Sequence, residues 1–95
     1  MTYKALPEGL YIGKSPVAGQ GIFSMMDIQI GTELGMSHLI IDDEIIRTPL
    51  GGFINHSNFP NCEKYLVGNR YYVKVIKAIG PKEELFLKYT FYKIK

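Results

Sequence analysis

The sequence of 95 residues contains a single cysteine, no tryptophan, and no apolar run of the roughly 20 residues that a membrane helix needs. One cysteine cannot form an internal disulfide or a cysteine-based zinc site, so Cys62 is expected to be a small buried hydrophobic residue. The N-terminus lacks an apolar stretch followed by a small-residue cleavage site. These absences predict a soluble, cytoplasmic protein without a membrane partner.

An excess of charge of one sign is also missing, because 11 lysine and arginine residues face 9 acidic residues. The basic residues are scattered, apart from a lysine-bearing C-terminus, whereas nucleic-acid binders usually gather them into a patch or stripe. We therefore expect no nucleic-acid partner. No metal site is expected either, because His38 and His56 are the only histidines and no carboxylate or cysteine stands at ligand spacing. The length predicts one domain, residues 1–95.

Short apolar runs dominate what is present. They are broken by glycine and proline and are rich in Val, Ile, Tyr and Phe, which favours strands over helices. The chain is therefore predicted to be mainly β. The expected strands cover residues 9–14, 21–26, 33–41, 63–67, 70–79 and 84–89.

Two connections between these strands have a local signature. The pair Gly68-Asn69 suits the positive φ angles of a two-residue hairpin turn. Residues 42–52, "DDEIIRTPLGG", are expected to hold at most one helical turn, which Pro49 would end.

Two polar or glycine-rich segments could carry chemistry. In "AGQG", from Ala18 to Gly21, glycines allow a close approach of the backbone to a ligand, although a plain tight turn is the more common explanation of GxG in isolation. No third glycine opens a long helix, so this is not a dinucleotide-binding fingerprint. The segment "NHSNFPNC", from Asn55 to Cys62, is either a loop whose Asn and Ser side chains bond their own backbone or the wall of a polar pocket.

Two further segments leave alternatives open. The aromatic residues of "EELFLKYTFY", Glu83 to Tyr92, could pack in the core or line a narrow slot for a ligand. The acidic run "DDE", Asp42 to Glu44, could attract a cationic substrate or form a solvated turn.

Taken in order, "SPVAGQGIF", "NHSNFPNC" and "KEELFLKY" resemble the SET-domain protein lysine methyltransferases. Members of that family carry a GxG turn, then an NHSxxPN segment, then an acidic-acidic-leucine strand that ends in tyrosine. The resemblance spans nearly the whole chain, and NHSxxPN is its most specific part. It implies a β-clip-like fold of several small sheets with a C-terminal pseudoknot, and S-adenosylmethionine-dependent methylation of a lysine presented by a protein substrate.

The resemblance also implies roles for individual residues. Tyr89 would be the catalytic tyrosine, and Phe91 or Tyr92 would cover the adenine ring of S-adenosylmethionine. Asn55 and His56 would hold the adenine and the amino group. The backbone of four consecutive residues would hold the methionine part of the cofactor: Ala18, Gly19, Gln20 and Gly21.

The chemistry implied by the resemblance is an in-line displacement, for which positioning is the main requirement. The attacking lysine amine must be neutral, and its ordinary pKa is about 10.4. A channel that desolvates the amine beside a cationic sulfonium favours loss of its proton, so no dedicated base is required. Pro60 and Asn61 would lock the shape of the pocket segment.

The chain departs from the family pattern between "GTEL" and "NHS", where it lacks most of the usual helical insert, and it lacks the cysteine-rich flanking segments. This pattern is typical of a minimal, viral or bacterial-like member. The substrate surface must be reduced, rebuilt by a second subunit, or absent. The apolar "LII" and "EII" segments lead us to expect a homodimer. The alternative function is a catalytically inactive SET-like β module that binds a protein partner.

Overall fold

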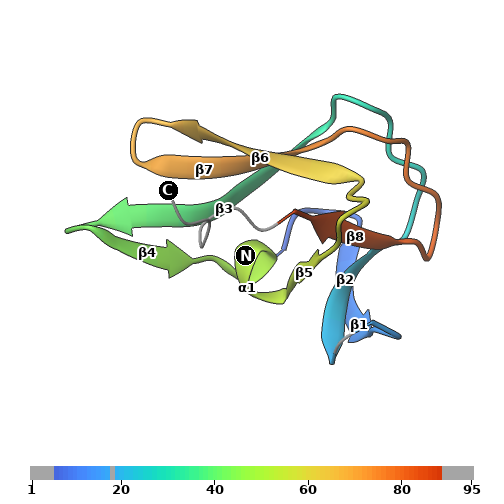
Figure 1. The fold of residues 1–95 in the computed structure, drawn as a ribbon. Coiled ribbons are helices and arrows are strands. Elements are labelled where there is room, and N and C mark those ends of the chain that lie inside the picture. Colours follow the sequence, from blue (N-terminus) through green and yellow to red (C-terminus); the bar gives the residue numbers. More distant parts are fainter. Residues whose placement is uncertain (1–5, 18, 89–95) are drawn as a thin grey trace, which may run out of the picture.

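The computed structural model describes residues 6–17 and 19–88, which form two four-stranded sheets and one short helix (Figure 1). The strand order of the first sheet is β1 (Leu10–Lys14), β2 (Gln20–Ser24), β8 (Glu84–Leu87), β5 (Asn55–His56). The order of the second sheet is β4 (Glu44–Arg47), β3 (Glu33–Ile41), β7 (Arg70–Val75), β6 (Cys62–Val67). Helix α1 (Pro49–Phe53) joins β4 to β5. The predicted mainly β class is confirmed.

The first sheet combines local and long-range pairing. Strands β1 and β2 form an antiparallel hairpin, and β8 pairs antiparallel with β2 and parallel with β5. Strand β8 therefore lies between two segments that are far away from it in the sequence. The predicted pseudoknot concerns the chain after β8, and residues 89–95 lie outside the described part.

The second sheet is a set of hairpins closed by tight turns. The predicted turn at Gly68-Asn69 joins β6 to β7, but only Gly68 has a positive φ, of 63°. Asp42 and Asp43 join β3 to β4 with φ angles of 50° and 66°, as a type I′ turn requires. The acidic run is thus solvent-exposed: its two aspartates form the hairpin turn, and Glu44 begins β4.

The prediction for residues 42–52 was wrong in two respects. Glu44–Arg47 form strand β4 rather than part of a helical turn, and Pro49 begins helix α1 instead of ending one. Proline is tolerated at the first helical position because the N–H that it lacks would have no helical partner there. Thr48 caps the helix, and its Oγ1 accepts a hydrogen bond from the Gly51 N–H at 3.3 Å.

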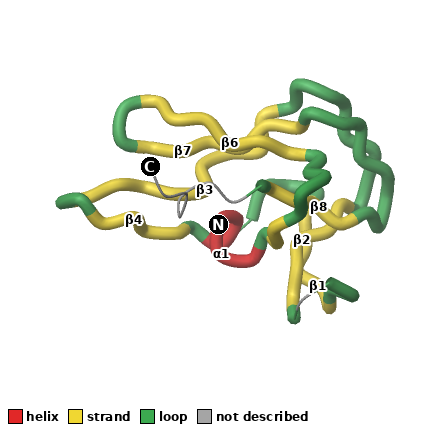
Figure 2. The backbone as a smooth tube through the Cα atoms, viewed as in Figure 1, coloured by secondary structure: helices red, strands yellow, loops and turns green. Residues whose placement is uncertain are grey.

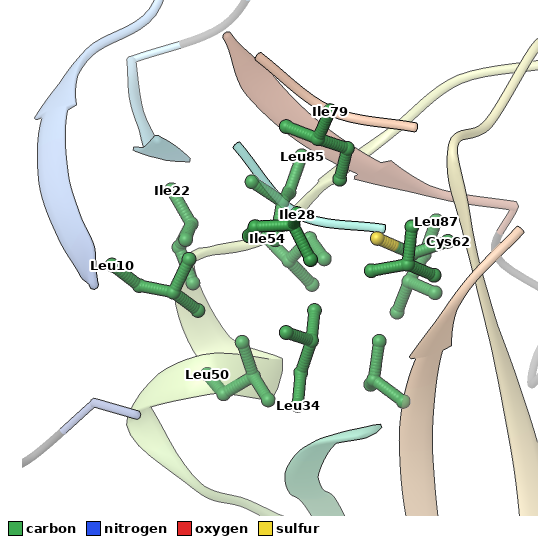
Figure 3. Packing of buried hydrophobic residues seen from close by; sticks show 12 residues of the cluster. Leu10, Ile22, Ile28, Leu34, Leu50, Ile54, Cys62, Ile79, Leu85 and Leu87 are labelled. Carbon is green, nitrogen blue, oxygen red and sulfur yellow. The ribbon is translucent and has the colours of Figure 1, made fainter. Parts of the chain in front are cut away.

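The hydrophobic core joins the two sheets and the helix (Figure 3). Cys62 is fully buried in it, and this burial raises the pKa of the thiol to about 12, as expected for a structural cysteine. The core comprises Leu10, Ile22, Ile28, Leu34, Leu50, Ile54, Cys62, Val73, Val75, Ile79, Leu85 and Leu87.

Two long loops connect the sheets, residues 25–32 between β2 and β3 and residues 76–83 between β7 and β8. They run alongside each other (Figure 2). They meet at Ile28 and Ile79, which exchange two backbone hydrogen bonds of 2.8 and 2.9 Å. Both side chains are buried. This bridge holds the two loops in register between the sheets. In the described part of the chain, no helix is long and apolar enough to cross a membrane.

Helix α1 packs closely on β3 through Gly51. A Cβ atom at this position would collide with the Ser37 carbonyl oxygen and would lie 2.9 Å from His38 Cε1. His38 is buried, and its desolvation, with smaller contributions from Lys64 and Arg47, lowers its pKa to about 4. The imidazole is therefore neutral near pH 7 and packs against the helix without a charge.

We predict that Gly51→Ala lowers the free energy of unfolding by about 1 to 3 kcal/mol, because the backbone contact leaves no room for a methyl group. The matched control is Gly52→Ala, where the nearest atom, Arg47 Cβ, is 4.0 Å from the added carbon. That change should be neutral or stabilising by up to about 1 kcal/mol. Urea unfolding of both variants measures the difference. Equal stabilities would contradict the packing described for α1.

Candidate active site

The three motif segments lie on neighbouring strands of the first sheet (Figure 1). The GxG segment forms the turn and the start of β2 in the β1–β2 hairpin, the acidic-leucine segment forms β8, and the NHS segment begins in β5. In register, Ile22 of β2 pairs with Leu85, and Asn55 pairs with Phe86. The three motif segments are far apart in the sequence, and they become neighbours because β8 pairs with both β2 and β5.

The side chain of Glu84 joins these segments. It is buried, and its two carboxylate oxygens accept hydrogen bonds from two different segments, the β1–β2 turn and strand β5. Oε1 accepts from Ser15 Oγ at 2.9 Å, and Oε2 accepts from Asn55 Nδ2 at 2.8 Å. A buried carboxylate is costly unless it is hydrogen-bonded, so these contacts are part of what makes the arrangement stable.

The two glycines of the GxG segment are required for different reasons. A Cβ atom at Gly21 would collide with Glu84 Oε2 and would lie 3.0 Å from Asn55 Nδ2. Gly19 has a φ of 46°, which favours glycine, and a Cβ atom there would meet no described neighbour within 4 Å. Gly21 thus allows the strands to approach, whereas Gly19 leaves the turn open on one side.

Asn55 connects the NHS segment to the GxG segment directly. Its Nδ2 donates to the Gln20 carbonyl oxygen at 3.1 Å as well as to Glu84. These two contacts hold the Asn55 side chain between β8 and the GxG turn. His56 follows it, is exposed, and pairs in register with Leu87.

The structure thus brings together four of the predicted cofactor residues, Gly19, Gln20, Gly21 and Asn55, with His56 adjacent in β5. The predicted residues Ala18, Tyr89 and Phe91 lie outside the described part, as does Tyr92. Tyr89 comes two positions after the last residue of β8.

Asn61 fixes the far end of the pocket segment. Its Nδ2 donates to the Glu84 carbonyl oxygen at 2.9 Å, and its Oδ1 accepts from the Phe86 N–H at 2.8 Å. Its own carbonyl oxygen accepts from the Ile76 N–H at 2.9 Å. Asn61 therefore locks the segment, as predicted, but it does so by tying β8 to the chain that follows β7.

The local-loop interpretation of the NHS segment holds for Ser57, whereas the pocket-wall interpretation stays a prediction. Ser57 Oγ accepts from the Phe59 N–H at 3.0 Å, which is the local turn expected of a polar loop. Asn55 and Asn61 instead bond to distant strands. Sequence reasoning missed the central roles of Glu84 and Ser15. The available signal was an acidic residue at the start of an otherwise apolar strand, where a buried carboxylate needs partners.

The described residues contain no group of three or more His, Cys, Asp or Glu side chains arranged to hold a metal ion. What the described residues place together is a turn with open space beside Gly19 and, close to it, the buried carboxylate of Glu84. The negative charge of this carboxylate favours a ligand that carries positive charge.

Comparison with protein families gives a match to the SET domain over residues 37–90, which is more than half of the chain. The chain therefore belongs to the SET-domain family. The match contains the NHS segment and β8, and so includes the residues around Glu84.

Solved structures agree with this assignment. A Plasmodium falciparum protein described as a candidate histone methyltransferase matches with a TM-score of 0.77 and 21% identity, over 95% of this chain and 100% of that one. The methyltransferase domain of human PR domain-containing protein 2 matches with a TM-score of 0.73 and 18% identity, over 95% and 82%. These similarities establish the fold, so the predicted SET-type architecture is confirmed.

A Chaetomium thermophilum Polycomb Repressive Complex 2 structure with a bound inhibitor also matches, with a TM-score of 0.73 and 22% identity. The match covers 87% of this chain but only 15% of that one. A SET fold can thus be a small part of a larger assembly. No curated protein sequence matches the chain significantly.

We predict that Glu84→Gln lowers the free energy of unfolding by about 1 to 3 kcal/mol, because an amide cannot accept from both Ser15 and Asn55. The matched control is Glu83→Gln, because Glu83 is exposed. In the wild type its Oε1 accepts a hydrogen bond from the Gly80 N–H at 2.7 Å, and the glutamine oxygen can accept the same bond. The control should change stability by less than about 0.5 kcal/mol. Chemical denaturation of both variants measures the free energies of unfolding. A Glu84 variant as stable as the control would show that the carboxylate does not hold the strands together.

Proposed function

We propose that the chain is an S-adenosylmethionine-dependent protein-lysine N-methyltransferase. The observation that carries this proposal is the junction at Glu84, where the GxG turn, Asn55 and β8 meet in one sheet. Membership of the SET-domain family supports the reaction class, and SET methyltransferases use S-adenosylmethionine. The two SET structures described above, one of a candidate histone methyltransferase and one of a methyltransferase domain, are consistent with it.

The residues at the junction fit the cofactor by their chemistry. S-adenosylmethionine supplies a methyl group activated by a positively charged sulfur. Gly19 leaves open space beside the turn, so the backbone of Gly19, Gln20 and Gly21, together with Ala18, would hold the methionine part. Asn55 would hold its amino group, and the nearby Glu84 carboxylate favours a cationic ligand. His56 would contact the adenine, and Phe91 would cover it.

The remaining task of the chain is to position a neutral lysine amine. Tyr89 is proposed to orient the amine through its hydroxyl, because it comes only two positions after β8, the strand that Glu84 and Asn61 fix. Desolvation of the amine lowers its pKa and favours the neutral form that attacks. The substrate is therefore proposed to be a protein that presents a lysine, and the location of the enzyme is proposed to be cytoplasmic.

The test is calorimetric titration of S-adenosylmethionine and of its demethylated product into the wild type and two variants. Asn55→Ala should weaken binding by about tenfold or more, because it removes a hydrogen bond to a charged group. The matched control is Asn58→Ala, an exposed position in the same segment, which should leave binding unchanged. Tyr89→Phe should retain binding while labelled methyl transfer to protein falls by about 100-fold.

Two results would contradict the enzyme assignment. Folded wild type that does not bind S-adenosylmethionine would leave the alternative, a SET-like module that binds a partner without catalysis. Normal binding with no labelled product on any lysine-rich protein would support the cofactor site but remove the catalytic role of Tyr89.

We also infer a homodimer through the edge strand β4. All four of its residues are exposed, with Ile45 at 46% and Ile46 at 45%. Since Glu44 pairs with Ile41 beside a two-residue turn, the backbone groups of Ile45 point away from β3. A second copy added antiparallel about Ile45 would place Asp43 opposite the partner's Arg47, so that opposite charges meet.

The edge-strand dimer predicts that Ile45→Lys and Arg47→Asp shift the protein towards monomer in analytical ultracentrifugation, because each introduces repulsion at the pairing edge. Ile12→Lys is the control, since Ile12 is a similarly exposed isoleucine, at 37%, in the edge strand β1. A wild type that stays monomeric at high micromolar concentration would exclude the dimer.

A further inference from the structure

A second candidate binding site lies on the second sheet, away from the Glu84 junction. It is a shallow, open hollow of about 550 Å³, and its walls come from β3, β6 and β7. None of the residues of the candidate active site contributes to it. It is lined by Glu33, Leu34, Gly35, Tyr65, Val67 and Tyr72.

Strand register explains why two tyrosines and a carboxylate meet there. Tyr65 of β6 pairs directly with Tyr72 of β7, and their ring centres are 5.9 Å apart with a tilt of 32°. Tyr65 donates its hydroxyl hydrogen to Glu33 Oε1, across β7. The ladder of β3 is irregular between Glu33 and Gly35, and Gly35 has a φ of 120°. This positive φ favours glycine at position 35, next to the irregular part of the ladder.

These tyrosines are on the face of the sheet that does not form the core. Val73 and Val75 alternate with Tyr72 along β7, and both valines are buried, whereas Tyr65 and Tyr72 are only partly buried. The Glu33 side chain is exposed. The two tyrosines are therefore partly accessible to solvent, beside an exposed carboxylate, and core packing alone does not explain them.

A lysine of the chain itself shows that this surface accepts an ammonium group. Lys74 Nζ lies 5.6 Å from the centre of the Tyr65 ring and 3.6 Å from Glu63 Oε2. In the ladder, Lys74 pairs with Glu33 of β3 on one side and with Glu63 of β6 on the other, and the ion pair is made with Glu63. Arg70 stands at the turn end of the same strand, beyond the hollow.

We propose that this hollow binds the side chain of an N-methylated lysine presented by another protein. A methylated ammonium is less strongly hydrated than a free one, so it gains more from the faces of Tyr65 and Tyr72 in an open site. Glu33 supplies the opposite charge at the rim. Binding at this site does not require methyl transfer by this chain, so it goes beyond the proposed function and is tested separately from it.

The test is an NMR titration of the wild-type chain with the amide of Nα-acetyl-Nε-trimethyllysine. The signals of Tyr65, Tyr72 and Gly35 should shift with saturation in the millimolar range. A neutral analogue with a tert-butyl group in place of trimethylammonium has nearly the same shape. It should bind about three- to fivefold more weakly, because it lacks the attraction of the cation to the rings.

Variants separate the proposed site from nonspecific binding. Tyr72→Leu should abolish saturation, and Lys74→Met should tighten binding, because it removes the internal ammonium that competes for Tyr65 while it keeps most of the side-chain length. Tyr11→Leu is the matched control, since Tyr11 stacks on Phe23 at 5.7 Å in the other sheet, outside the hollow. It should have no effect.

Two outcomes would overturn the proposal: equal binding of the neutral analogue, or equal loss in the Tyr11 and Tyr72 variants. Absence of binding in both the wild type and Lys74→Met would also overturn it. The same titration on Asn55→Ala keeps the two proposals distinct. That variant should bind the trimethyllysine probe as the wild type does, whether or not S-adenosylmethionine binds at the Glu84 junction.

Discussion

The Glu84 carboxylate is the contact on which the arrangement of the first sheet depends. Ser15 comes from the β1–β2 hairpin and Asn55 from β5, and both donate to oxygens of this one buried side chain. The close approach of Gly21 to the same carboxylate requires a residue without a Cβ. A buried carboxylate that lost either donor would be strongly unfavourable, so the three motif segments stabilise one another.

Asn61 extends this junction to the rest of the molecule. It bonds to the backbone of β8 on both sides of Leu85 and also accepts from Ile76, which follows β7. The bridge between Ile28 and Ile79 holds the neighbouring loops. The pocket segment is thus fixed at both ends by strands that pack into the core. Such preorganisation is what a reaction that depends mainly on positioning needs.

The sequence predicted those features that have local signatures. Short apolar runs rich in Val, Ile, Tyr and Phe indicated most strands, and the pair Gly68-Asn69 indicated the β6–β7 turn. Strand β4 was missed because Pro49 was taken as a helix end, whereas Thr48 makes it a helix start. The motifs located the site through a family resemblance, but the role of Glu84 arises from long-range pairing of β8, which no local pattern encodes. The tyrosine hollow likewise depends on the irregular register near Gly35.

On the proposed function, the GxG turn and the NHS segment form one cofactor site. A backbone amide NMR map of the wild type with and without S-adenosylmethionine tests this. The signals of Gly19, Gln20, Asn55 and His56 should shift together with one affinity, while the exposed β3–β4 turn is unchanged. Shifts in only one of the two segments, or none in either, would contradict it.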